Sequence, residues 1–194
     1  MLRRSLVLVA ALGLVLAAAA PAALVHVRIE GRTTTIFGAA EPRALAANAL
    51  EALDAASRGG EFHYALTTSS YGSYVSQIGK YPGTGTAGWV FKVNRVSPPV
   101  GADQVELRDG DVVLWYWADF SAGSGPKTLG LFEKGGCYRV AAFDDAGKES
   151  PAAGAVLHVD GRTLPASFTG SCLGPHRGLV RATAPGAVRS NVLR

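Results

Sequence analysis

The spacing of hydrophobic and polar positions changes along the chain and divides it into elements. Residues 25–30 alternate strictly between apolar and polar side chains, the pattern of a half-buried strand. A turn is expected at residues 30–32. Residues 33–37 are rich in Thr, Ile and Phe, which suit a pleated surface, so they are predicted to form the returning strand.

Residues 41–58 change to the period of a helix. Pro42 suits a first helical turn, and Gly59 begins a glycine pair that is expected to end the helix. One apolar stripe follows this period and consists of Ala46, Ala49, Leu50 and Leu53. A short alanine-rich helix is not stable alone, so we expect it to pack against a sheet.

Two strongly apolar strands follow a Tyr-, Ser- and Thr-rich stretch at residues 62–78 and a loop at residues 81–86. Residues 88–94 place Trp89, Phe91 and Val93 on one face. Residues 111–117 are apolar on both faces, with Val113, Trp115 and Trp117 on one and Val112, Leu114 and Tyr116 on the other. The second strand is therefore predicted to lie inside the sheet.

A run of small residues at 121–126 predicts a hinge between domains of residues 23–125 and 126–194. Beyond the hinge, short strands separated by turn residues are expected at 128–132, 137–143, 155–159, 178–183 and 188–193. This spacing is typical of a small β-sandwich. The predicted fold class is α+β and mostly β, with a small helix-packed sheet followed by a small β-sandwich-like domain.

Residues 1–22 have the pattern of a signal peptide. Arg3 and Arg4 precede an uncharged apolar run, and small residues follow where a peptidase would cut. We therefore predict a secreted or extracytoplasmic protein, with attachment to the cell surface left open, and no membrane contact after cleavage. An uncleaved N-terminal anchor is the alternative, because residues 6–25 are about long enough to span a bilayer.

The charge of the chain does not favour a nucleic-acid partner. The formal charge is +4, and the leader contributes Arg3 and Arg4 to it. The remaining charges are scattered, whereas a nucleic-acid surface needs a cluster of Lys and Arg.

The chain has two cysteines, Cys137 and Cys172. In an oxidising compartment, an even pair predicts a disulfide that closes a long loop. Two free buried thiols are the alternative if the chain is not exported.

The polar residues do not form a recognisable catalytic or metal-binding pattern. Asp109-Gly110-Asp111 is interpreted as a tight turn in preference to a pair of catalytic carboxylates. Residues 83–88 are glycine-rich but precede a strand and lack the lysine of a phosphate loop. The four histidines lack metal-ligand spacing: His26, His63, His158 and His176. We expect a non-enzymatic protein without a cofactor or a metal.

Large aromatic residues are concentrated in residues 71–117. Most such side chains belong to protein cores. However, Trp115, Tyr116 and Trp117 are consecutive in a two-faced strand, so they can all be buried only if both faces are covered. At least one should stack on a flat ligand or partner, or contact the second domain. The Tyr-rich segment 71–81 is expected to form a polar rim.

Four segments in this order resemble the transcobalamin C-terminal-like domain family: Tyr71–Gly79, Gly88–Asn94, Gly101–Asp103 and Leu107–Tyr116. That family occurs in vitamin B12 carriers and, as a domain of unknown function, in exported bacterial proteins. The resemblance covers about residues 24–120. The sequence departs from the family pattern at Phe91, where Tyr is usual, and at Arg95, where Gly is usual.

The resemblance implies a binding role, with a corrinoid as the ligand that the family suggests. In the carriers this domain covers one face of the corrin, and a helical domain without a counterpart in this sequence holds the other. The expected ligand-binding residues are Tyr71, Tyr74, Tyr81, Trp89, Asn94, Trp115 and Trp117. The hypothesis is an exported binding module for a corrinoid or another planar or amphiphilic small ligand. The alternative is a structural or adhesive module that contacts cell-surface proteins.

Overall fold

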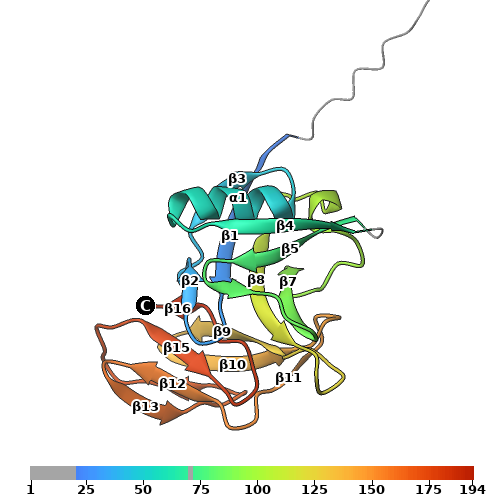
Figure 1. Ribbon diagram of the computed structural model, residues 1–194. Coiled ribbons are helices and arrows are strands. Elements are labelled where there is room, and N and C mark those ends of the chain that lie inside the picture. The colour runs from blue at the N-terminus through green and yellow to red at the C-terminus, as the bar shows by residue number, and fades with distance from the viewer. Residues whose placement is uncertain (1–20, 70–71) are drawn as a thin grey trace, which may run out of the picture.

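The computed structural model describes residues 21–69 and 72–194. Most of the predicted leader and Tyr71 therefore lie outside the described residues. Figure 1 shows a helix-bearing N-terminal half, residues 23–119, above an all-strand C-terminal half, residues 128–194. The fold is α+β and mostly β, which confirms the predicted class.

The main sheet of the N-terminal half has five strands in the order β2-β1-β8-β7, with β3 also paired to β1. Their bounds are β1 (Ala23–Glu30), β2 (Thr35–Phe37), β3 (Arg43–Ala46), β7 (Ala87–Val93) and β8 (Val112–Asp119). Strands β1 and β8 are parallel, and the other pairs are antiparallel. Strand β8 lies inside the sheet, as its two apolar faces predicted.

The helix α1 (Ala49–Gly59) is shorter than predicted. The prediction is wrong for residues 41–48, because β3 pairs there with the beginning of β1. Asn48 begins the helix instead: its side chain accepts a hydrogen bond from the Glu51 N–H at 2.9 Å. The Glu51 carboxylate reaches back to the Ala47 N–H at 2.8 Å. This reciprocal cap fixes the start of the helix inside the apolar stripe.

The Tyr-rich stretch forms a small three-stranded sheet that crosses over the main sheet (Figure 1). Its strands are β4 (Tyr64–Ser69), β5 (Gly72–Ile78) and β6 (Tyr81–Pro82). Val75 and Ile78 of β5 are buried in the core of the N-terminal half. A short 3-10 helix, η1 (Ala102–Gln104), lies in the connection between β7 and β8. The segment predicted as a rim is thus also a structural layer.

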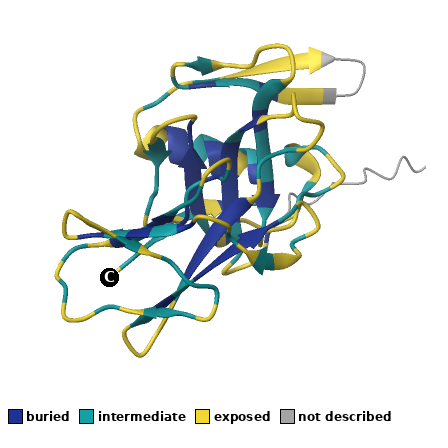
Figure 2. Ribbon diagram, turned by 90° about the horizontal axis from the view of Figure 1, so that it is seen from below, coloured by how far each residue is buried: buried dark blue, intermediate teal, exposed yellow. Residues whose placement is uncertain are grey.

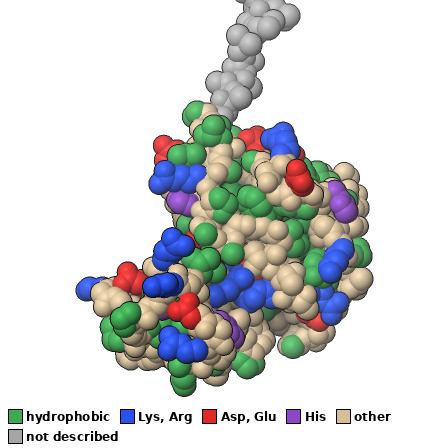
Figure 3. Space-filling view, turned by 90° about the vertical axis from the view of Figure 1, so that its left-hand side faces the viewer, with side chains coloured by type: hydrophobic (Ala, Val, Ile, Leu, Met, Phe, Trp, Pro, Cys, Tyr) green, Lys and Arg blue, Asp and Glu red, His purple; other side chains and the backbone are tan. Residues whose placement is uncertain are grey.

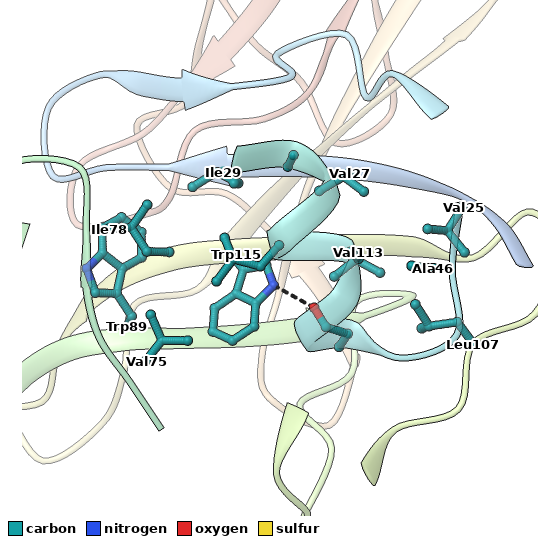
Figure 4. Close-up of a cluster of buried hydrophobic side chains, with 14 of the residues drawn as sticks. Val25, Val27, Ile29, Ala46, Val75, Ile78, Trp89, Leu107, Val113 and Trp115 are labelled. Carbon is teal, nitrogen blue, oxygen red and sulfur yellow. Dashed lines mark hydrogen bonds between the residues drawn. The ribbon is translucent and has the colours of Figure 1, made fainter. Parts of the chain in front are cut away.

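The core of the N-terminal half lies between α1, the main sheet and β5 (Figure 4). The Trp115 indole crosses this core, and its Nε1 donates a hydrogen bond to the Ala49 carbonyl at 3.2 Å. Trp115 is 2% exposed and Trp89 is 7% exposed. Both tryptophans are therefore mainly core side chains.

The C-terminal half consists of two four-stranded sheets with a shared apolar core. One sheet contains β9 (Thr128–Lys134), β10 (Cys137–Phe143), β11 (Glu149–Pro151) and β14 (Ser171–Cys172). The other contains β12 (Val156–Val159), β13 (Arg162–Pro165), β15 (Val180–Thr183) and β16 (Val192–Leu193). Cys137 and Cys172 face each other on β10 and β14 and form the predicted disulfide.

The face of the main sheet opposite α1 is covered by the C-terminal half. Figure 2 shows the middle of the main sheet as buried. Leu114, Tyr116 and Ala118 of β8 pack there with Val188 of the C-terminal half. Of the three consecutive aromatics, Trp115 thus belongs to one core and Tyr116 to the contact between the halves, whereas Trp117 is half-buried.

A buried ion cluster joins the two halves. The Glu30 carboxylate is completely buried and contacts the guanidinium groups of Arg28, Arg181 and Arg189. Arg181 and Arg189 belong to the C-terminal half, and Figure 3 shows basic side chains near the boundary between the halves. Burial lowers the pKa of the Arg181 guanidinium, and the charge of Glu30 opposes this shift. The alternating pattern of β1 would place both Arg28 and Glu30 in solvent, so sequence reasoning missed this cluster.

Lys92 of β7 makes a second polar contact between the halves. Its side chain is fully buried, and its Nζ donates to the carbonyls of Asp144 at 2.7 Å and Phe143 at 3.3 Å. The Asp145 carboxylate lies 3.3 Å away. Burial lowers the pKa of the Lys92 ammonium, against the opposing effect of Asp145.

Replacing Lys92 with methionine is expected to lower the free energy of unfolding by about 1–3 kcal/mol, because two carbonyls lose their donor in a buried contact. Urea denaturation followed by circular dichroism measures this loss. The exposed Lys134 supplies the control, and Lys134→Met should change stability by less than about 0.5 kcal/mol. Equal stability of the two variants would contradict the role assigned to the Lys92 ammonium.

Candidate functional site

A groove of about 300 Å³ follows the outer edge of β7. We call it the edge groove. Trp89 and Phe91 line it from the α1 side of the sheet, and Val90 and Tyr116 line it from the opposite side. Adjacent residues of a strand point to opposite faces, so a groove that contacts both sets must wrap around the edge of the sheet.

The remaining walls come from segments on both sides of β7. The β4–β5 hairpin, α1, the β7–β8 connection and the residue after β8 contribute Leu66, Tyr74, Val75, Leu50, Pro98, Ala102 and Phe120. Three of these side chains are unusually exposed for their size: Leu66 at 46%, Tyr74 at 53% and Phe120 at 39%. Exposed apolar side chains that gather around one hollow indicate a binding surface, whereas isolated ones do not.

The rim of the edge groove is acidic. Asp103 and Asp145 line it, and the lining contains no Lys or Arg. The Asp145 carboxylate accepts a hydrogen bond from the Ser97 hydroxyl at 3.1 Å. Burial raises the pKa of the Tyr116 phenol far above its ordinary value, so this group stays protonated. Asp145 also lies 3.3 Å from the Lys92 ammonium, so Asp103 provides most of the charge left for a ligand. An apolar floor with this carboxylate at the rim favours a ligand that is apolar in one part and cationic in another.

Three of the residues predicted from the sequence reach the edge groove: Tyr74, Trp89 and Trp115. The Trp89 indole is held in place by a hydrogen bond from its Nε1 to the Tyr81 carbonyl at 2.8 Å. The rings of Trp89 and Trp117 pack edge to face, with centroids 5.7 Å apart. Tyr81 and Trp117 are therefore not among the lining residues, but they support the ring of Trp89 from behind.

Asn94 does not line the edge groove, and its side chain bonds to the beginning of β8 instead. Its side-chain amide donates to the Asp111 carboxylate at 2.7 Å and accepts from the Val112 N–H at 2.9 Å. Asn94 also has a positive φ of 49°, which asparagine tolerates better than most residues. These contacts hold together the ends of β7 and β8. Tyr71, the other predicted residue, lies outside the described residues.

Phe91, Leu66, Tyr116 and Phe120 line the edge groove but were not predicted as ligand-binding residues. Phe91 lies on the same strand face as Trp89, so the alternation of this strand could have predicted Phe91 as a lining residue. Leu66 continues the alternation of Tyr64, and Phe120 that of Tyr116 and Ala118, but alternation alone does not show that either side chain stays exposed beside a groove.

A second, larger cleft of about 840 Å³ lies between the halves. Trp117, Arg32 and Lys127 line it together with the loop at residues 121–126. Asp119 and Arg189 also line it, but most of its other walls are Gly, Ala and Pro, which have no polar side-chain groups. The edge groove combines aromatic walls with placed polar groups and is the better candidate site.

Within residues 21–69 and 72–194, no three His, Cys, Asp or Glu side chains gather in a group that could hold a metal ion. No helix in this described part of the chain is long and apolar enough to cross a membrane.

Comparisons with known proteins give one family match. Residues 46–119 match the family described as a domain of unknown function (DUF4430). The match spans α1, the three-stranded sheet, β7 and β8, and thus includes the lining residues of the edge groove except Phe120 and Asp145. No curated protein matches the sequence. Among solved structures, a candidate metal-binding protein from Ruminococcus gnavus ATCC 29149 is 13% identical, with a TM-score of 0.37. That alignment covers 50% of this chain and 97% of the other, and its similarity is too low to support a conclusion.

Proposed function

We propose that this protein is an exported, non-catalytic binding module that holds the apolar part of an amphiphilic ligand in the edge groove. The observation that carries the proposal is the gathering of Leu66, Tyr74 and Phe120 around one hollow, although their size would normally bury them. Exposing such side chains costs free energy in the unliganded protein, and a ligand that covers them recovers it.

Two further features support the proposal. The apolar leader and the Cys137–Cys172 disulfide fit a protein that functions in an oxidising compartment. The described lining of the edge groove contains neither His nor Cys, so its Ser73 and Ser97 hydroxyls have no imidazole or thiol beside them. A serine nucleophile is commonly activated by a general base such as an imidazole. The carboxylate that Ser97 contacts, Asp145, already pairs with the Lys92 ammonium.

The family resemblance suggests a corrinoid as the ligand. A volume of about 300 Å³ is at the lower limit of ligand pockets, which reach about 1,000 Å³. A corrin ring would therefore rest against Tyr74 and Phe120 at the rim, and only one of its side chains would enter the groove. Smaller planar amphiphiles fit the groove more completely.

Titration of the purified protein with cobinamide and with the planar dye Nile red tests this proposal. Binding should quench tryptophan fluorescence, because Trp89 and Trp115 line the groove. Tyr74→Ala should weaken binding about fivefold or more, which is the effect expected of an aromatic side chain that covers a ligand. Tyr74 is more than half exposed, so its loss should leave the fold intact.

The control for this titration is Leu45→Ala. Leu45 is an exposed apolar side chain on β3 and does not line the edge groove. This variant should bind both probes as the unmodified protein does. If Tyr74→Ala and Leu45→Ala bind equally well, the ligand lies elsewhere. Binding of Nile red without cobinamide would keep the groove as the site and remove the corrinoid.

A further inference from the structure

The backbone of β7 presents unpaired hydrogen-bonding groups along the edge groove. The Asn94 N–H donates to the Val112 carbonyl at 2.9 Å, and the Phe120 N–H donates to the Thr86 carbonyl at 2.9 Å. In an antiparallel pair, only alternate residues bond to the neighbouring strand. These two bonds show that the backbone N–H and C=O groups of the even-numbered β7 residues point toward β8. The N–H and C=O groups of Trp89 and Phe91 therefore point outward.

The chain covers both ends of this edge but not its middle. Ala87 exchanges hydrogen bonds with Thr84 at one end, and Val93 exchanges them with Val96 at the other. Between these ends, no described strand pairs with the outer side of β7. The open edge is thus a short slot, long enough for about five residues of an extended chain.

The devices that usually protect an edge strand are missing from β7. Edges are commonly guarded by proline or by exposed charges, above all lysine. Strand β7 contains no proline, and its one charged residue, Lys92, turns away from solvent into the contact between the halves. The polar and apolar walls of the edge groove flank this unguarded edge directly.

We propose that the edge groove receives an extended peptide of a partner protein, which pairs with Trp89 and Phe91 as an added strand of the main sheet. The proposal rests on the proposed function, since it uses the same groove, and it names the class of ligand. Such strand addition draws its affinity from backbone hydrogen bonds and its selectivity from alternate side-chain pockets.

The walls indicate which peptide fits. Side chains on one face of the added strand would meet Val75, Leu50 and Trp115, which favours apolar residues. Side chains on the other face would pass Asp145, and Asp103 also lines the groove. The Lys92 ammonium already lies 3.3 Å from Asp145, so Asp103 carries most of the negative charge that the lining leaves for a partner. The partner peptide is therefore expected to alternate apolar with basic residues.

The test uses a synthetic, end-blocked peptide of eight residues that alternates valine or phenylalanine with lysine. Its control is the same peptide with methyl groups on alternate backbone nitrogens, so that one edge cannot donate hydrogen bonds. The unmodified peptide should bind the full chain, and the methylated one at least tenfold more weakly. In hydrogen exchange followed by NMR, the amides of Trp89 and Phe91 should be protected only by the unmodified peptide.

A pair of protein variants separates backbone pairing from side-chain contact. Phe91→Ala removes the ring, and Phe91→Pro removes both the ring and the outward N–H. Proline is tolerated on an edge strand where its nitrogen faces solvent, so the pairing with β8 should persist. The proline variant should bind the peptide at least fivefold more weakly than the alanine variant. Thermal unfolding checks that both are folded.

The outcomes are distinct. Equal binding of the two peptides, or unprotected Trp89 and Phe91 amides in the complex, would overturn strand addition. The peptide comparison uses the unaltered protein, so it decides the question even if Phe91→Pro does not fold. Failure of the peptide to bind, together with Nile red binding that Tyr74→Ala weakens, would overturn the peptide inference alone. Failure of both probes would overturn the proposed function as well.

Discussion

Replacing Glu30 with alanine is expected to lower the free energy of unfolding by about 3–5 kcal/mol, the typical cost of leaving a buried charge uncompensated. The Glu30 carboxylate is completely buried and is shared by three guanidinium groups. Its loss would leave Arg28, Arg181 and Arg189 close together with one carboxylate fewer. Arg28 is the most buried of the three, and Glu41 is the acidic partner that it would retain among residues 21–69 and 72–194.

Urea denaturation followed by circular dichroism measures this loss over both halves of the molecule. Glu149→Ala is the matched control, because Glu149 also pairs with an arginine, Arg139, but on the surface. An exposed pair of this kind contributes less than about 1 kcal/mol. If Glu30→Ala and Glu149→Ala cost the same, the cluster does not hold the halves together.

The isosteric variant Glu30→Gln separates charge from shape. The amide keeps one acceptor oxygen for the arginines but has no negative charge, and its NH₂ group would face guanidinium donors. Glu30→Gln should therefore lower the free energy of unfolding by nearly as much as Glu30→Ala. A nearly stable Glu30→Gln variant would mean that packing, and not charge, makes Glu30 necessary.

The parts of the fold that depend on local periodicity could be predicted from the sequence. The double apolar character of residues 112–117 correctly placed β8 inside the sheet, and the turn-separated strands correctly indicated a sandwich-like C-terminal half. The helix start was wrong, because residues 43–46 fit both a helical stripe and a strand. The pairing of β3 with β1 and the cap at Asn48 make these residues a strand. Of these two causes, only the Asn48 cap can be recognised from the local sequence.

Contacts between distant segments could not be predicted. Arg28 and Glu30 follow the polar positions of an alternating strand, which predicts exposure when only one face of a sheet is covered. In the structure the second face is also covered, by residues such as Arg181, which lies 151 positions from Glu30 in the sequence. Nothing within β1 itself indicates this layer.

The candidate site also has residues that could be predicted from the sequence and residues that could not. Tyr74, Trp89 and Trp115 could be selected because aromatic side chains are distinctive in a sequence. Leu66 and Phe120 complete the groove through the placement of the β4–β5 hairpin and of the end of β8. Their contribution depends on being left exposed, which is a property of the folded surface and not of the residue type.

Replacing both Cys137 and Cys172 with alanine is expected to lower the free energy of unfolding by about 4 kcal/mol. The bond closes a loop with a sequence separation of 35, and the chain-entropy model assigns this magnitude to such a loop. Once the bond is gone, the two-residue strand β14 keeps its pairing with β10 and the hydrogen bond from the Ser171 hydroxyl to the Pro165 carbonyl at 3.2 Å.

Thermal and urea unfolding of the double variant measure this loss, and a reducing agent supplies the control. Reduction should destabilise the unmodified protein to the level of the double variant and leave the variant itself unchanged. A loss below about 1 kcal/mol would show that the unfolded chain is hardly restricted by the bond. Because neither cysteine lines the edge groove, Nile red binding to the folded variant should be unchanged. This result would separate the contribution of the disulfide to stability from the function of the groove.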